Sequence, residues 1–290
     1  MANTPVFTAS EEGQLFLDTE DYIQFRKLMF KKSGIDLNLY KQQQMHRRLL
    51  TLVEKAGCKN FVEYFNFLDK NSTEYACFLD RMTINVSELF RNPEKWIEME
   101  KQILPPMLAG RKPLRIWSAG CSYGAEPFSL AILLDRISPG VSHTIHATDL
   151  DLSILAKAKQ GIFDSNDIRN LPAADIEKYF QVIPSTKGPG MPQRYQIIDK
   201  LRSRVTFRQQ NLLADRFEEG YDLICCRNVV IYFTNEAKDA LYAKFMNALR
   251  PGGVLFVGGT ERIFGYQNLG FESIIPFFYS RAGEGKKAAA

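Results

Sequence analysis

The chain has 290 residues, of which 45% are hydrophobic and 24% charged, and its formal net charge is +4. This composition is typical of a water-soluble globular protein of about two domains. No apolar run approaches the ~20 residues that a membrane-spanning helix needs, so the sequence excludes an integral membrane protein.

The N-terminal segment predicts a protein that is not exported. Glu11 and Glu12 stand where a signal peptide would carry basic residues followed by a long apolar segment. The five cysteines form an odd, scattered set without a C-x-x-C pair, which is typical of reduced thiols. We therefore expect a cytoplasmic location.

Residues 20–84 predict four short amphipathic helices. Apolar residues recur there at helical spacing, and the segments SGIDLN, EKAGCKN and DKNST separate the helices with Gly, Asx or Ser residues. We expect a small all-α domain over residues 15–84, with its aromatic residues in the core. The repeating apolar positions are Tyr22, Phe25, Met29, Met45, Leu49, Leu52, Val53, Ala56, Phe61, Tyr64, Phe65, Leu68, Tyr75, Phe78, Leu79 and Met82.

This helical region is basic. Residues 21–60 hold nine Lys or Arg against three Asp or Glu, a local charge of +6. Such a surface attracts an acidic partner: a nucleic acid, an anionic lipid or a Glu-rich protein face. A solvated helix face explains the same charge equally well.

The next segment, residues 85–113, is predicted to be a linker with one helix. The helix runs from about Pro93 to Leu104, and the prolines and glycine of LPPMLAGRKP are expected to end it.

From residue 114 to 283 the pattern alternates between strands and helices. The expected strands cover 114–119, 143–149, 204–211, 221–226 and 252–259, and the expected helices 126–137, 151–160 and 234–250. This order predicts a doubly wound α/β domain with a mostly parallel sheet, a Rossmann-like fold.

The alternation is interrupted between about residues 162 and 203. A short helix and two candidate strands, 179–183 and 194–198, flank the Gly/Pro-rich segment STKGPGMP. We expect a small antiparallel β insertion at about 165–203. The last residues, 284–290, are expected to form a disordered tail.

The loop GCSYGAEP after the first strand predicts a site for a small ligand. It lacks both the G-x-G-x-x-G of dinucleotide folds and the Lys-Ser/Thr of a phosphate loop, which disfavours a diphosphate. Gly120 and Gly124 still allow a tight turn and a close approach of the ligand to the backbone. A plain strand-to-helix corner is the alternative.

Asp149 ends the second strand, 25 residues after Gly124. A carboxylate in that place binds ribose hydroxyls in Rossmann-type folds. Without phosphate-binding residues in the first loop, it indicates a nucleoside with a different tail, and S-adenosylmethionine (SAM) is the candidate. Alternatively Asp149 caps the following helix, although Asp151 is also available.

Polar residues also follow the other strands. Arg227 and Asn228 come abruptly after the apolar strand YDLICC, and Asn211 ends the strand before it. Buried polar groups need partners, which a ligand can supply. No metal is expected, because His143 and His146 have no Cys or acidic ligand in the right pattern nearby.

Together these segments resemble a known family. The segments MTINVSELFRNPEKW, WSAGCSYGAEPFSLA, ATDLD, NLL and CRNVVIYF, in this order, resemble the bacterial chemotaxis receptor methyltransferases (CheR), and GIDLNLYKQQQMHRRL resembles their N-terminal domain. The resemblance covers residues 20–282. It implies a helical domain, a SAM-dependent methyltransferase domain and an inserted β subdomain.

The resemblance also implies roles for single residues. Arg91 and Tyr232 would lie near the reacting methyl group, and Glu126 would bind the methionine end of SAM. The implied cofactor-binding set is Asn85, Ser87, Arg91, Gly120, Glu126, Asp149, Asn211, Leu212, Arg227 and Asn228. Asn85 and Ser87 are also explained as a helix-capping stretch. Tyr123, Ala125 and Ser87 depart from the residues that the family often carries, without removing an assigned side chain.

The implied reaction is the transfer of the SAM methyl group to glutamates on the cytoplasmic helices of membrane chemoreceptors, which leaves S-adenosylhomocysteine. Arg47 and Arg48 would dock that acidic substrate. We expect a monomer that binds neither nucleic acid nor metal, does not insert into the membrane, and is recruited to receptor arrays.

Two other functions stay open. One is a SAM-dependent methyltransferase of another acceptor such as nucleic acid, although the Asn/Asp-Pro-Pro-aromatic loop of amino-methylating DNA enzymes does not follow the fourth strand. The other is a non-catalytic SAM-binding signalling module. A nicotinamide oxidoreductase is disfavoured, because its glycine pattern is missing.

Overall fold

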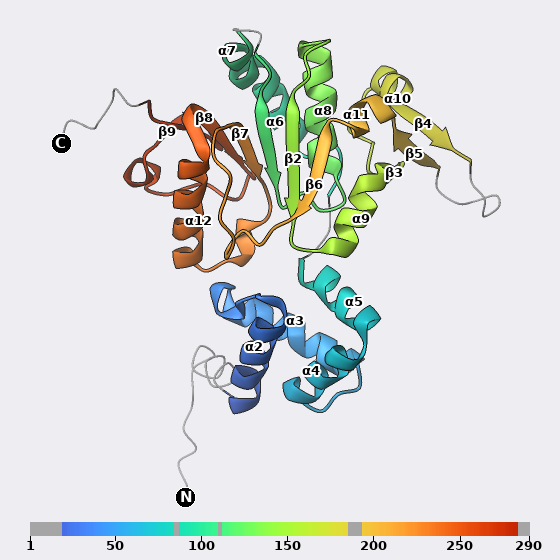
Figure 1. Ribbon diagram of the computed structural model, residues 1–290, viewed down its shortest axis with the longest axis vertical. Helices are drawn as coiled ribbons and strands as arrows, with labels where there is room; N and C mark the ends of the chain where they lie inside the picture. Colours follow the sequence, from blue (N-terminus) through green and yellow to red (C-terminus); the bar gives the residue numbers. More distant parts are fainter. Residues whose placement is uncertain (1–18, 84–86, 110–111, 185–192, 284–290) are drawn as a thin grey trace, which may run out of the picture. The chain divides into compact units, whose positions relative to one another are not determined.

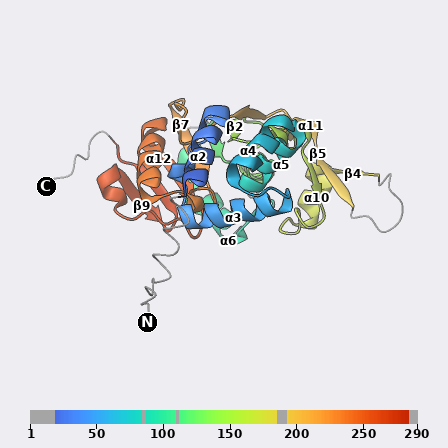
Figure 2. The same ribbon diagram turned by 90° about the horizontal axis from the view of Figure 1, so that it is seen from below.

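Figures 1 and 2 show the computed structural model of the chain, which describes residues 19–83, 87–109, 112–184 and 193–283. The chain forms two compact units, and each is described by itself. The first unit joins residues up to 82 with 232–239, and the second contains residues 83–231 and those from 240 on. The predicted tail 284–290 and the segment 185–192 lie outside the described residues.

The first unit is helical, as predicted. Its elements are α2 (Glu20–Ser33), the 3₁₀ turn η1 (Leu37–Leu39), α3 (Gln42–Lys55), α4 (Phe61–Lys70) and α5 (Ser72–Thr83) (Figure 2). Gly34 ends α2 with a left-handed φ of 71°. The Asn60 side chain accepts a hydrogen bond from the N–H of Glu63 and so caps α4. These are the stop and start signals expected from the sequence.

The aromatic residues of this unit form its core. Tyr22 and Phe25 are fully buried, and both rings pack against Phe61. The carboxylate of Asp21 accepts hydrogen bonds from the N–H groups of Phe61 and Val62, which ties α2 to the start of α4. The structure therefore confirms that these aromatic positions are core.

Residues 232–239 complete the first unit. Phe233 forms an isolated antiparallel bridge with Tyr40, and their rings pack edge to face with centroids 5.2 Å apart. The N–H of Lys41 donates to the carbonyl of Tyr232 at 2.9 Å. Tyr232 and Phe233 are thus held among the helical residues, Tyr232 by a backbone contact and Phe233 by a ring contact.

The second unit contains a seven-stranded sheet in the order β6-β2-β1-β7-β8-β10-β9. The first five of these strands are parallel, as predicted, and β10 pairs antiparallel with β8 and β9. The strands are β1 (Arg115–Ala119), β2 (Thr144–Asp149), β6 (Val205–Gln209), β7 (Tyr221–Cys226), β8 (Leu249–Val257), β9 (Phe271–Ile275) and β10 (Phe278–Arg281). The strand order reverses between β1 and β7, where open α/β sheets bind ligands.

Helices cover both faces of the sheet (Figure 1). Helices α8 (Ala125–Ile137) and α9 (Leu152–Gln160) pack on β1, β2 and β6. On the opposite face, Phe245 of α12 (Asn235–Ala248) packs against Trp117. This two-faced cover explains why β7 is buried along its whole length.

The final two strands were not predicted. The sequence interpretation ended its strands at residue 259, whereas β9 and β10 extend the sheet beyond β8. Strand β9 lies at the sheet edge, with Glu272, Ser273 and Ile274 exposed. A short edge strand with an exposed middle lacks the alternating apolar pattern that identifies a half-buried strand.

The antiparallel insertion is a separate small sheet in the order β3-β5-β4 (Figure 1). It consists of β3 (Ile162–Asp164), α10 (Ala173–Tyr179), β4 (Phe180–Ile183) and β5 (Arg194–Ile197), and α11 (Asp199–Arg202) follows it. The two predicted strands are confirmed. The third, β3, was missed because three residues after a glycine carry too short a pattern.

The helix predicted to end near Leu104 continues instead to Leu108. It runs as α6 (Pro93–Glu98), a π-helical turn η2 (Met99–Ile103) and α7 (Leu104–Leu108). The two prolines therefore do not end the helix. They fall in the first turn of α7, where a missing N–H costs little because the π-helical turn has already shifted the hydrogen-bond pattern.

Candidate functional site

The loop after β1 is a tight turn bound to the end of β2. The N–H groups of Gly120 and Cys121 both donate to the carbonyl of Thr148. Gly120 has a φ of 82°, and a Cβ at this position would lie 2.5 Å from the Cγ2 of Val229. Only glycine fits this position, because the Val229 side chain already fills the space that a Cβ would need.

Asp149, at the end of β2, is held by backbone N–H groups. Its Oδ2 accepts from the N–H of Ser122 at 2.8 Å, and its Oδ1 from that of Asp151 at 3.2 Å. Asp151, not Asp149, caps α9 by accepting from the N–H of Ser153. The helix-cap alternative for Asp149 is therefore wrong. Burial raises the pKa of Asp149, against the backbone hydrogen bonds it accepts.

Glu126 lies at the start of α8, buried beside Arg227. The Ser118 hydroxyl donates to Oε1 of Glu126 at 2.7 Å, whereas Oε2 lies 3.8 Å from Nη1 of Arg227, beyond hydrogen-bond distance. Burial raises the pKa of Glu126, and the charges of Arg227 and Arg91 oppose that rise. Within the described residues, Oε2 therefore has a long ion pair to Arg227 and no hydrogen bond.

Arg227 brings the segment around Arg91 to the strand ends. Its Nη2 donates to the backbone carbonyl of Arg91 at 2.8 Å and to the Asn92 side chain at 3.0 Å. Its guanidinium lies over the Phe256 ring, 4.7 Å from the centroid. Its Nε is buried without a hydrogen-bond partner in the described part of the chain. An unpaired buried donor of this kind is costly unless a ligand or water satisfies it.

Asn228 has an uncommon left-handed backbone with a φ of 60°. Glu261, which the sequence analysis missed, stabilises it: the carboxylate accepts from the N–H groups of Asn228 (2.6 Å), Val230 (3.0 Å) and Gly258 (2.7 Å). Glu261 is a buried acid just after a strand. The signal that selected Asn211, a polar residue at a strand end, would have found it too.

The structure describes three of the four remaining cofactor candidates. Ser87 is half-buried, and its carbonyl accepts from the Tyr123 hydroxyl. Asn211 accepts from the N–H of Leu213 through its side chain, and Leu212 is buried with its carbonyl bound by Lys244. Asn85 lies outside the described residues.

The other predicted residues belong to the first unit. Arg47 is exposed on α3. Arg48 is half-buried, donates to the carbonyl of Met82 at 2.9 Å and lies over the ring of Tyr232, 5.4 Å from its centroid. The two residues assigned to substrate docking thus differ: Arg47 faces solvent, and Arg48 also has contacts within its own unit.

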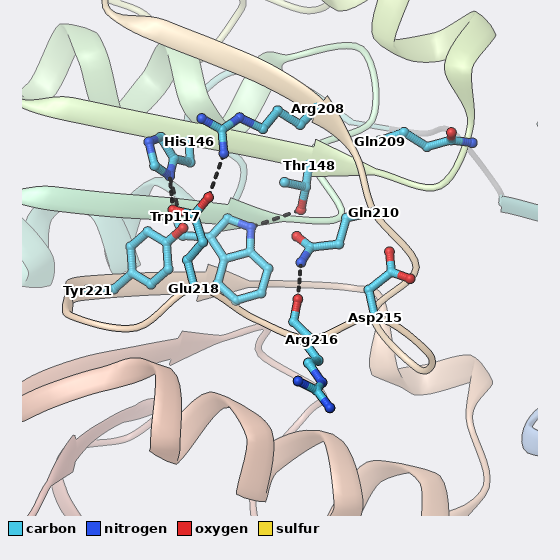
Figure 3. A pocket seen from close by; sticks show the side chains of 10 residues that line it. All are labelled: Trp117, His146, Thr148, Arg208, Gln209, Gln210, Asp215, Arg216, Glu218 and Tyr221. Atoms are coloured by element: carbon cyan, nitrogen blue, oxygen red, sulfur yellow. Dashed lines mark hydrogen bonds and ion pairs between the residues drawn. The ribbon is translucent and has the colours of Figure 1, made fainter.

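A pocket of about 160 Å³ opens on the face of the sheet where Trp117 packs against α12 (Figure 3). Its lining groups bond to one another: Trp117 to Thr148, His146 to Tyr221, and Arg208 to Glu218. None of the residues predicted above is among those that line it. The full lining is Trp117, His146, Thr148, Arg208, Gln209, Gln210, Asp215, Arg216, Glu218 and Tyr221.

The described residues contain neither a membrane-spanning helix nor a metal-binding cluster of side chains. In those ranges no helix is long and apolar enough to cross a membrane. Nor does the described part hold three or more His, Cys, Asp or Glu side chains grouped to bind a metal ion. His143 instead accepts from the N–H of Leu114.

Comparison with known proteins gives a consistent result. Residues 85–274 match the family model "CheR methyltransferase, SAM binding domain", and residues 20–83 match "CheR methyltransferase, all-alpha domain". A chemotaxis protein methyltransferase of Listeria monocytogenes is 42% identical over 90% of this chain and 97% of its own length. One of Borreliella burgdorferi is 33% identical over 88% of this chain and 92% of its own.

Proposed function

Since this chain belongs to the CheR methyltransferase family, we propose that it transfers the methyl group of SAM to glutamate side chains of chemoreceptors. The products are glutamyl methyl esters and S-adenosylhomocysteine. The receptor glutamates lie on cytoplasmic helices, so the protein would act in the cytoplasm at receptor arrays, as a monomer. The observation that carries this proposal is that the buried Arg227 lies between Glu126 and the backbone of Arg91 at the switch point of the sheet.

The residues at the strand ends fit SAM. The unbonded Oε2 of Glu126 suits the ammonium of the methionine end, and Asp149 suits the ribose hydroxyls. Gly120 permits the tight turn between β1 and α8, and the Nε of Arg227, which has no hydrogen-bond partner in the described part of the chain, offers a donor. Asn211 and Leu212 would bind the adenine side, and Asn228 would contact the cofactor beside Arg227 after β7. Ser87 would contact the cofactor from the segment before β1.

The reaction needs little acid–base chemistry. SAM supplies a methyl group on a positively charged sulfur. A glutamate with a pKa of about 4.3 is already an anion at neutral pH, so the nucleophile needs no general base. The task of the protein is to align the carboxylate with the methyl group and exclude water, for which effective molarities of roughly 10⁵ to 10⁸ M are possible.

Arg91 is the proposed orienting group for the substrate carboxylate, and Tyr232 the group that positions the methyl or substrate through its hydroxyl. A tight ion pair to Arg91 would stabilise the ground state, since the carboxylate loses charge as the ester forms. The charge of Arg91 opposes the rise that burial causes in the pKa of Glu126.

Transfer of a labelled methyl group from SAM distinguishes this proposal from the two other functions. With receptor-containing membranes, we expect protein-bound label that is released as methanol by mild base, because methyl esters are base-labile. Base-stable label on nucleic acid would favour another acceptor. Binding of SAM without transfer to any acceptor would favour a non-catalytic module.

Charge reversal at Arg47 tests the docking surface. Arg47 is exposed, so Arg47→Glu should raise the KM for receptor about tenfold, through loss of an attractive charge and gain of a repulsive one. The SAM Kd should stay at the wild-type value. Lys159→Glu, an equal charge change at an exposed site of α9, is the matched control. If both variants have the same receptor KM, the basic surface is only a solvated helix face.

A further inference from the structure

Residues 87–91, here called the strap, carry two of the proposed cofactor and substrate contacts, Ser87 and Arg91. The strap is almost without regular secondary structure, so side chains from elsewhere must hold it. At its C-terminal end, the carbonyl of Arg91 accepts from Arg227 and from the Trp96 indole. In its middle, the N–H of Phe90 donates to the Ser129 hydroxyl at 2.9 Å.

The rest of the strap is bound to the start of the β insertion. The N–H of Leu89 donates to the carbonyl of Asp167 at 2.9 Å, and the Leu89 carbonyl accepts from the Asn170 side chain at 3.3 Å. Glu88 forms an ion pair with Arg169 at 2.5 Å. The segment 167–170 lies between β3 and α10, so these contacts fix the position of the strap relative to the insertion.

Tyr123 joins three segments at one hydroxyl. It belongs to the loop between Gly120 and Gly124, and its hydroxyl contacts both the carbonyl of Ser87 and the Oδ1 of Asp167, the latter at 2.9 Å. The other carboxylate oxygen of Asp167 accepts from the N–H of Asp164, at the end of β3. The Tyr123 ring packs near Phe163, with centroids 6.1 Å apart.

Burial raises the pKa of Tyr123 well above its ordinary value, and the charge of Asp167 adds to that rise. The raised pKa keeps the hydroxyl protonated as a donor, with one proton for the two oxygens that it contacts. The Asp167 carboxylate also accepts from the N–H of Asp164, so the hydroxyl ties the carbonyl of Ser87 to a group that is itself held in place.

We propose that Tyr123 and Asp167 are positioning residues for methyl transfer, which hold the strap over the glycine turn and couple its position to the β insertion. Neither residue touches the reacting atoms in this account. They act through Ser87 and Arg91. The inference rests on the proposed function, because it assigns a supporting role to two residues of that same site.

The test is Tyr123→Phe in the full chain, which keeps the ring and removes only the hydroxyl. Loss of a buried hydrogen bond of about 1.4 kcal/mol corresponds to a tenfold effect. We expect the SAM Kd from calorimetry to rise about tenfold and kcat to fall, with the receptor KM unchanged. Tyr195→Phe is the control, because within the described ranges the Tyr195 hydroxyl bonds the exposed side chain of Gln193 and no strap residue.

Asp167→Asn and the double variant make the test specific. If the two residues act as one unit, the double variant should bind SAM no more weakly than the worse single variant. A lower melting temperature with wild-type SAM Kd and kcat in Tyr123→Phe would overturn the proposal, and so would additive losses in the double variant.

The wild-type protein in the same experiment separates this inference from the proposed function. If wild-type protein binds SAM but labels no receptor, the proposed function fails. If wild-type protein labels receptor and Tyr123→Phe does so equally well, only the positioning role fails.

Discussion

Replacing Arg91 with Ala should lower kcat by about 100-fold or more and raise the SAM Kd by less than about tenfold. The substitution removes the guanidinium that is proposed to orient the substrate carboxylate. It leaves the backbone carbonyl of Arg91, which binds Arg227 and Trp96, so the strap keeps those two bonds. Single-turnover kinetics with receptor, together with calorimetry for SAM, measure the two effects separately.

Two further variants define what Arg91 does. Arg91→Lys keeps the charge but loses the planar fork of donors, so it should recover only part of the turnover. Lys157→Ala, at an exposed site on α9, should behave as wild type. Normal turnover in Arg91→Ala would remove Arg91 from the reaction, and an equal loss in SAM affinity and turnover would make it a cofactor contact alone.

Glu126→Ala should raise the SAM Kd by about 100-fold. A hydrogen bond to a charged group contributes roughly 1.5 to 3 kcal/mol, and the substitution also leaves the buried guanidinium of Arg227 with less compensating charge. Calorimetry with SAM measures the loss. Unchanged affinity would mean that Glu126 only favours the start of α8 through the helix dipole.

The same residue predicts a pH dependence of SAM binding. Burial raises the pKa of Glu126 and that of Asp149, so both carboxylates take up a proton at a higher pH than exposed ones would. The ionised form binds the cofactor ammonium, so SAM affinity should fall as the pH is lowered through these raised pKa values. Glu126→Gln should show a shallower fall, because only Asp149 still titrates. An identical pH profile in this variant would contradict the assignment of Glu126.

Local pattern was sufficient to predict the frame of the site. The parallel strands were found because buried strands are continuous apolar runs. Their order placed Gly120, Asp149 and Arg227 together at the carboxyl ends of neighbouring strands. The edge strand β9 was missed because exposure breaks that pattern, and its neighbour β10 was missed because its four residues carry too short a pattern.

What the sequence could not predict depends on contacts between distant segments. Either Asp149 or Asp151 suits a helix cap by position, and only the hydrogen bonds show that Asp151 caps α9. Tyr123 is 36 residues from Ser87 and 44 from Asp167, so no local pattern links them. The helix after Pro93 was predicted too short, because the sequence did not reveal the π-helical turn that makes its prolines tolerable.

The most direct test of the proposed function is to map the methyl group on the acceptor. The protein is incubated with SAM and a chemoreceptor cytoplasmic fragment, and the receptor peptides are analysed by mass spectrometry with and without mild base. The account predicts one added methyl group on specific glutamate side chains, which base removes, with loss of the signal in Arg91→Ala. SAM binding with no methylated glutamate, or a methyl group that survives base, would contradict it.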